Sequence, residues 1–162
     1  MVPPEQQELP TTAIARSPAL HATSEPWFEY PVTVYPHHTD YAGIVWHGTY
    51  LTWMEEARVA CLDSIGINFA DFVKLGCDLP VVELSTRYHN ALKMGMAAIV
   101  KTRMNDIQGV RMEWEYRIES PDRKTLYLSG RVTLVSVDRE KGKIMRQLPP
   151  AVEEVFKKIR GI

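Results

Sequence analysis

The sequence predicts an α+β fold in which one antiparallel sheet wraps around one long central helix. An apolar stripe at helical spacing runs through residues 50–65 and is wide enough to bury a helix on most sides. Four long segments with strand character follow it, at residues 79–89, 96–104, 110–118 and 125–138. A curled sheet would cover most of the helix, and a second copy of the chain would cover the remaining flank.

Local signals place the individual elements. Tyr30, Val32 and Val34 alternate along a first strand at residues 29–35, and a loop at 36–48 leads to the long helix. Thr49 is the expected N-cap of that helix, and Gly66 is the expected residue just beyond its end.

The second half of the chain carries equally clear boundaries. Asn68 and Asp71 open a short helix that Gly76 closes. Residues 110–118 alternate most regularly, which predicts a strand with one solvated face. Turns are expected at 93–95, 105–109, 121–124 and 138–142, and a terminal helix from Pro149 and Pro150 to near Arg160.

The chain divides at Trp27. Residues 1–26 hold five of the 11 prolines and no aromatic side chain, so we expect a disordered N-terminal tail followed by one domain at 27–162. The tail has neither the apolar run of a secretory signal nor the arginines of a transit peptide. No apolar run reaches membrane-spanning length, and we expect a cytoplasmic protein without a membrane span.

Composition excludes several classes of protein. The chain is 45% hydrophobic and 24% charged, with a net charge of −1, which argues against a nucleic-acid partner. Cys61 and Cys77 form no CxxC pair, so we expect reduced structural thiols. The histidines match no zinc-ligand spacing, and no metal is expected.

The loop before the long helix carries the chemistry. Asp40 lies a few residues ahead of a helix N-terminus, whose free N–H groups can polarise a carbonyl oxygen. A carboxylate at that place can attack the carbonyl or deprotonate a water, as acyl transfer to water requires. The alternative is structural: Asp40 caps a turn and Gly43 supplies a positive φ.

Residues 39–50 (TDYAGIVWHGTY) and 54–58 (MEEAR) resemble the signature of the 4-hydroxybenzoyl-CoA thioesterase family of hotdog-fold enzymes. Residues 63–68 and 100–103 are also similar to plant and cyanobacterial acyl-thioesterases. The resemblance covers about residues 28–140 and leaves the tail and the terminal helix outside. It implies a homodimer or homotetramer with the hotdog fold that hydrolyses an acyl-CoA or acyl-carrier-protein thioester. It implies no cofactor, since coenzyme A is part of the substrate.

The resemblance places the family's catalytic carboxylate on Asp40, as nucleophile or general base. It places the N–H that polarises the thioester carbonyl at His47, whose side chain assists in some bacterial members. Gly48 and Thr49 follow at the start of the helix and are assigned to substrate binding. Tyr41 replaces a smaller residue of many members and is expected to narrow the acyl pocket. Trp46 either lines the acyl site or anchors the start of the helix in the core.

The phosphates of coenzyme A require basic residues. Arg87, His89 and Lys93 are the first candidates, and Lys101, Arg103 and Arg111 the next. The same residues would face an acidic helix if the substrate is an acyl carrier protein. The acyl group itself remains open between aromatic, naphthoyl and fatty chains.

Two alternatives to a thioesterase remain. A hotdog hydratase or dehydratase needs a His–carboxylate pair, which His47 with Glu55 could supply, although the dehydratase loop motif is absent. A non-catalytic acyl-CoA-binding module is the other, and the presence of Asp40 argues against it.

Overall fold

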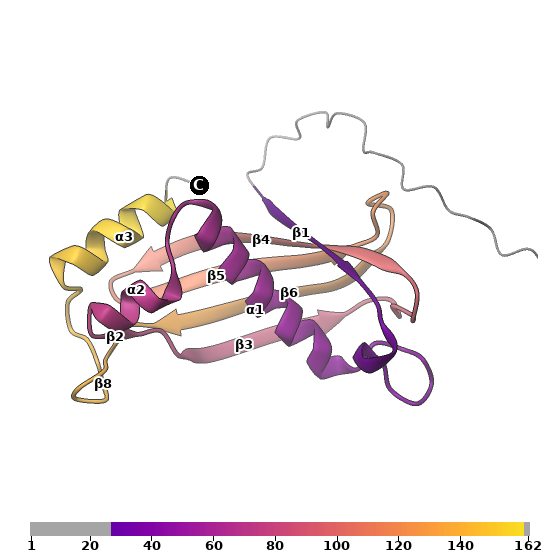
Figure 1. Cartoon of the computed structure of the whole chain (residues 1–162), viewed down its shortest axis with the longest axis horizontal. Helices are drawn as coiled ribbons and strands as arrows, with labels where there is room; N and C mark the ends of the chain where they lie inside the picture. The colour runs from indigo at the N-terminus through magenta and orange to yellow at the C-terminus, as the bar shows by residue number, and fades with distance from the viewer. Residues whose placement is uncertain (1–26, 161–162) are drawn as a thin grey trace, which may run out of the picture.

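The computed structural model describes residues 27–160, with the elements in the predicted order (Figure 1). The main sheet is antiparallel throughout, in the order β1-β4-β5-β6-β3. Its strands are β1 (Phe28–Thr33), β3 (Val81–Tyr88), β4 (Ala97–Gln108), β5 (Arg111–Glu119) and β6 (Leu126–Val135). Helix α1 (His47–Ser64) lies across one face of this sheet. The predicted α+β architecture is confirmed, while the predicted tail at 1–26 lies outside the described residues.

The core lies between α1 and the sheet. Met54 and Cys61 of α1 are buried together with Val100 of β4, Tyr116 of β5 and Leu128 of β6. The sheet's concave side therefore covers the apolar stripe that defined the helix in the sequence. The exposed polar side chains of the helix include Thr52, Glu55, Glu56 and Asp63, whereas Arg58 is buried and donates to the Tyr116 hydroxyl at 2.8 Å.

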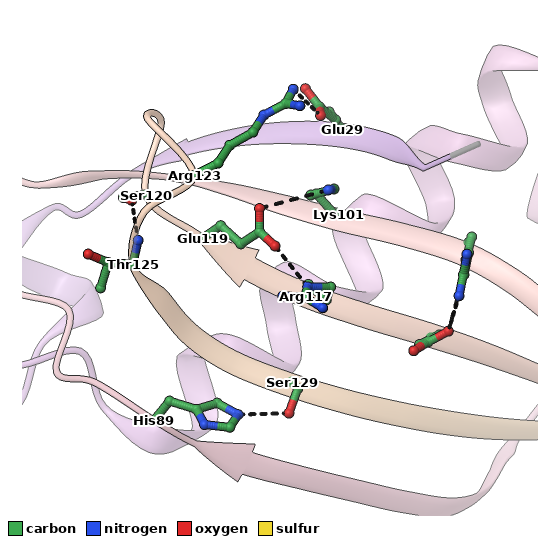
Figure 2. Close-up of polar contacts among 11 residues, drawn as sticks. Glu29, His89, Lys101, Arg117, Glu119, Ser120, Arg123, Thr125 and Ser129 are labelled. Atoms are coloured by element: carbon green, nitrogen blue, oxygen red, sulfur yellow. Dashed lines mark hydrogen bonds and ion pairs between the residues drawn. The ribbon is translucent and has the colours of Figure 1, made fainter. Parts of the chain in front are cut away.

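The two faces of the sheet differ as the alternation in β5 predicts. Trp114 and Tyr116 are fully buried under α1, while Glu115 and Arg117 lie on the other face. Figure 2 shows this charged face, where Glu119 lies within 3.8 Å of Lys101 Nζ and 2.8 Å of Arg117 Nε.

Shorter elements complete the end of the molecule opposite the loop at residues 39–46. A three-stranded sheet joins β2 (Cys77–Asp78), β7 (Val137–Asp138) and β8 (Lys143–Ile144). Helix α2 (Phe69–Lys74) begins at the predicted capping box of Asn68 and Asp71. Helix α3 (Pro150–Arg160) packs Phe156 against Phe72 of α2, with ring centroids 6.2 Å apart. No helix among residues 27–160 is long and apolar enough to cross a membrane.

Two predicted strand boundaries are wrong. Strand β4 continues through the turn expected at 105–109, because Ile107 pairs with Met112 and is buried, so only Gly109 and Val110 remain to turn the chain. The strand expected at 125–138 breaks at Ser136, and the residues after it pair with β2 instead of β3. At the first place the hairpin pairing of β4 with β5 overrides the turn signal, and at the second the distant pairing with β2 ends the main strand early.

Candidate active site

The loop at 39–45 folds as a tight turn around Asp40. Asp40 N–H donates to the carbonyl of Ile44 at 2.8 Å, and Gly43, with φ +71°, donates to the carbonyl of Asp40 at 3.1 Å. Asp40 Oδ1 accepts from the N–H of Ala42 at 2.8 Å and of Ile44 at 3.3 Å. One carboxylate oxygen therefore caps the turn, which is the structural role that we considered for Asp40.

The other oxygen of Asp40 is left for chemistry. The side chain is exposed, and within residues 27–160 no group donates a hydrogen bond to Oδ2. The turn thus orients the carboxylate through Oδ1 while Oδ2 stays available. Capping and catalysis are compatible at this residue.

Helix α1 begins earlier than predicted. Trp46 is the N-cap residue, no side chain caps the helix, and Thr49 is its third residue, not its N-cap. The apolar stripe starts only at Tyr50, so hydrophobic spacing could not reveal the exposed first turn. The Thr49 hydroxyl instead donates to the carbonyl of His38 at 3.0 Å. This bond connects α1 to the short 3-10 helix η1 (Pro36–His38).

Two N–H groups at this helix start are unpaired. Thr49 N–H donates to the carbonyl of Trp46 at 2.9 Å, but in the described part of the chain nothing accepts from the N–H of His47 or Gly48. Unpaired N–H groups at a helix N-terminus carry partial positive charge and favour a developing oxyanion. The geometry agrees with the polarising N–H expected at His47 and adds that of Gly48.

Trp46 covers the first turn without entering the core. Its side chain is 51% exposed, so the core-anchor interpretation is wrong. A Cβ built on Gly48 would overlap atoms of the Trp46 indole, which means that the ring rests directly on the glycine backbone. A side chain at residue 48 would fit only if the exposed Trp46 ring moved, and an indole face lies beside the unpaired N–H groups.

Tyr41 is fully exposed at the tip of the loop in the single chain. Its expected part in narrowing an acyl pocket therefore stays a prediction that requires a second wall. A cavity of about 440 Å³ does exist, between α3 and the β4–β5 turn, but it contains none of the predicted site residues. Around Asp40 the single chain presents an open surface.

The predicted basic group is divided between the charged face of the sheet and the loop beside the Asp40 turn. His89 Nε2 lies 2.8 Å from Ser129 Oγ on the charged face (Figure 2). Arg87 of β3 lies opposite Ser129 of β6 in the sheet, so its side chain shares that face. Lys93 lies beyond β3, in a loop that pairs with Ile44 next to the Asp40 turn. The three residues do not form one cluster, because Lys93 lies in the loop after β3, paired with Ile44.

Two of the second set of cations, Lys101 and Arg103, are already engaged on that same face. Arg103 binds Glu115 at 2.8 Å and stacks on Trp27 at 4.3 Å. Lys101 lies between Glu119 and the Trp27 ring. These contacts identify them first as partners of glutamates and of Trp27.

The sequence did not indicate that Tyr88 contacts the start of α1. The Tyr88 hydroxyl donates to the carbonyl of His47 at 3.0 Å, which ties β3 to the first residue of α1. The contact spans 41 positions of the chain. The one feature of the sequence that points to this contact is a large aromatic residue, Tyr88, at the end of a strand.

Other titratable groups near the helix have structural partners. Tyr30 OH donates to Glu56 Oε2 at 3.3 Å, and burial, with Glu56 as a second cause, raises the pKa of Tyr30. His38 accepts from the N–H of Tyr35 at 3.0 Å, and burial lowers the pKa of His38. Among the described residues no group of three His, Cys, Asp or Glu side chains is arranged to hold a metal ion.

A sheet wrapped around one long helix, α1, is the hotdog fold, and the Asp40 turn lies beside the uncapped start of that helix. The sequence profile of the thioesterase-like superfamily matches residues 34–158. The chain belongs to this superfamily and is a thioester hydrolase, with acyl-CoA thioesterase activity established at the level of the family. The match includes most of α3, so the expectation that the terminal helix lies outside the family domain is wrong.

Individual relatives agree with this assignment. The chain is 57% identical over 141 residues to a Synechocystis protein named "Putative esterase sll0410", covering 87% of this chain and 85% of that protein. It is 32% identical over 133 residues to the acyl-CoA thioesterase YbgC of Haemophilus influenzae, covering 80% and 93%. The structure of a DHNA-CoA thioesterase from Staphylococcus aureus superposes with a TM-score of 0.74 at 25% identity, covering 83% and 91%.

Proposed function

We propose that this chain hydrolyses an acyl-CoA thioester with Asp40 and the uncapped start of α1 as its working parts. The observation that carries the proposal is the pairing of an oriented carboxylate, free at Oδ2, with the unpaired N–H groups of His47 and Gly48. Acyl transfer to water needs these two functions, a nucleophile or base and an oxyanion site.

Two routes satisfy this arrangement. In the first, Asp40 attacks the thioester carbonyl, coenzyme A leaves as a thiolate that takes up a proton, and water hydrolyses the resulting anhydride. In the second, Asp40 takes a proton from water, the hydroxide adds to the carbonyl, and the tetrahedral intermediate expels the same thiolate. In both, the helix N–H groups of α1 stabilise the carbonyl oxygen as it gains negative charge.

The site is proposed to be completed by a second copy of the chain. Strand β3 is at the edge of the sheet and exposes four large apolar side chains, Val81, Val82, Leu84 and Tyr88. An exposed apolar edge strand is a template for pairing. Edge-to-edge pairing would supply the second wall that the open surface around Asp40 and Tyr41 lacks, as a homodimer or within a homotetramer.

The hydratase alternative is disfavoured by helix geometry. His47 and Glu55 lie eight residues apart on α1, which separates them by about 12 Å along the helix axis. A His–carboxylate pair on this one helix is therefore too far apart to work on adjacent carbons. The non-catalytic alternative is disfavoured by the free Asp40 oxygen.

The nucleotide of coenzyme A has two candidate sites in this chain. Lys93 is in the loop beside the Asp40 turn, whereas Arg87 and His89 lie on the charged face of the sheet. Contacts to the nucleotide are remote from the reacting carbonyl and should affect KM more than kcat. KM values of Lys93→Ala and Arg87→Ala, measured on acyl-CoA and on acyl-pantetheine, assign the nucleotide to the loop or to the charged face. Substitution of the residue that binds the nucleotide will raise KM for acyl-CoA and leave KM for acyl-pantetheine unchanged.

Thiol release from a panel of acyl-CoA and acyl-carrier-protein thioesters tests the proposal directly. Cys61 and Cys77 are free but buried, and burial raises the pKa of Cys61 to about 11, so the native protein contributes little to the thiol signal. Such unpaired cysteines also support a reducing, cytoplasmic setting. We expect hydrolysis without added metal or cofactor. Hydration of an enoyl-CoA without thiol release would contradict the proposal.

A further inference from the structure

We infer that Tyr88 is a positioning residue for hydrolysis, and that it aims the Gly48 N–H at the thioester carbonyl. The inference rests on the proposed function of the α1 start. The Tyr88 hydroxyl donates to the carbonyl oxygen of His47 at 3.0 Å. It reaches that oxygen from β3, a different element of the fold.

Peptide geometry explains why this one bond matters. The carbonyl of His47 and the N–H of Gly48 belong to the same planar trans peptide group and point in opposite directions. A donor that holds the carbonyl therefore also fixes the direction of the N–H. A carbonyl oxygen has two lone pairs, so the Tyr88 bond adds to the bond that this carbonyl makes within the helix.

The remaining tethers hold other groups of the first turn. Trp46 N–H and the Thr49 hydroxyl both donate to the carbonyl of His38, each at 3.0 Å. These bonds attach α1 to η1, on either side of the His47–Gly48 peptide. Tyr88 is the side chain in the described residues that binds this peptide itself.

Aromatic packing sets the position of the hydroxyl. The Tyr88 ring lies edge-on to Tyr50 with centroids 5.5 Å apart, and Tyr50 lies edge-on to Trp53 at 5.7 Å. Trp53 in turn lies edge-on to the His38 ring, with centroids 5.1 Å apart. The hydroxyl is therefore held by rigid rings, a requirement for a donor that must orient a neighbouring dipole.

Tyr88→Phe tests this inference because it removes only the hydroxyl. Tyr30→Phe is the matched control, since Tyr30 also donates from a strand to α1, but to Glu56, nine residues further along the helix. We expect Tyr88→Phe to lower kcat on the order of tenfold, with KM within about twofold, because the N–H acts in the transition state. Tyr30→Phe should leave both parameters near those of the wild type.

Amide hydrogen exchange supplies a readout that needs no substrate. Among the first three amides of α1, Thr49 N–H has an acceptor, the carbonyl of Trp46, so its exchange should be faster in Tyr88→Phe than in the wild type and unchanged in Tyr30→Phe. An unchanged kcat or an unchanged exchange rate in Tyr88→Phe, with an active wild type, would overturn the inference alone. A wild-type chain that releases no thiol from any thioester would overturn the proposed function and this inference together.

Discussion

Helices α1 and α2 begin in opposite ways. At α2, Asn68 Oδ1 accepts from Ala70 N–H at 2.8 Å, and Asn68 N–H donates to Asp71 Oδ2 at 3.4 Å. At α1 no side chain caps the helix, and the His47 and Gly48 N–H groups stay unpaired among the described residues. The same chain thus closes a structural helix with its own side chains and leaves the candidate catalytic helix open for a ligand.

The two ends of α1 repeat this contrast. Its C-terminal end is closed by Ile67 N–H, which donates to the carbonyl of Leu62 at 3.0 Å, and by Gly66 with φ +76°. Ile67 is buried as it makes this bond. An end closed and buried in this way stabilises the fold, whereas an open and exposed end costs stability and provides a binding site.

The largest expected effect is the loss of the carboxylate beside the open end. Asp40→Asn should keep the turn, because an amide oxygen can still accept from Ala42 and Ile44, but it removes the base or nucleophile. We expect kcat to fall about 10²–10⁴-fold, measured as thiol release. Asp71→Asn makes the same change at the capped helix and should leave kcat unchanged. Near wild-type turnover of Asp40→Asn would refute the central role of this residue.

A second prediction concerns the indole that rests on Gly48. Alanine is favoured over glycine in a helix by up to about 1 kcal/mol, so Gly48→Ala should stabilise a Trp46→Ala background. With Trp46 present, the new Cβ must displace the indole and the gain should disappear. A double-mutant cycle by urea unfolding should give a coupling of about 1 kcal/mol. Equal effects in both backgrounds would show that the indole does not rest on Gly48.

Removing the cap of α2 should affect stability alone. Asn68→Ala leaves the N–H of Ala70 without its partner and should lower the free energy of unfolding by about 1 kcal/mol. Thiol release at saturating substrate should not change. If Asn68→Ala reduced kcat without reducing stability, the distinction between a structural and a catalytic helix start would fail.

The smallest effect is a pH dependence at His38, whose carbonyl holds the α1 start. Burial lowers the pKa of His38, with the charge of His37 acting in the same direction. The folded protein therefore prefers neutral His38, and this stabilisation is present above the unfolded value of about 6.5 and lost as pH falls through the folded pKa. Urea midpoints should drop more on acidification in the wild type than in His38→Asn. An equal drop would assign the pH dependence to other groups.

Elements specified by neighbouring residues were predictable. The capping box of α2, the closure of α1 at Gly66, the alternation of β5 and the start of α3 near Pro150 all depend on residues within about one helical turn or strand. The Asp40 turn belongs to this group, because an aspartate followed by a glycine three residues on closes its own loop. The break after Val135 was not predictable in this way, because the residues beyond it pair with β2, about 60 positions earlier in the chain.

The sequence by itself determined the architecture, the family resemblance and the candidate carboxylate, because each depends on the spacing of residues that are close together in the chain. Only the tertiary structure decided what surrounds that carboxylate. It placed Arg87 and Lys93 apart, left Tyr41 exposed, laid Trp46 on Gly48 and brought Tyr88 to His47. These relations join residues through sheet pairing and side-chain packing, which depend on the whole fold and leave no periodic signal in the sequence.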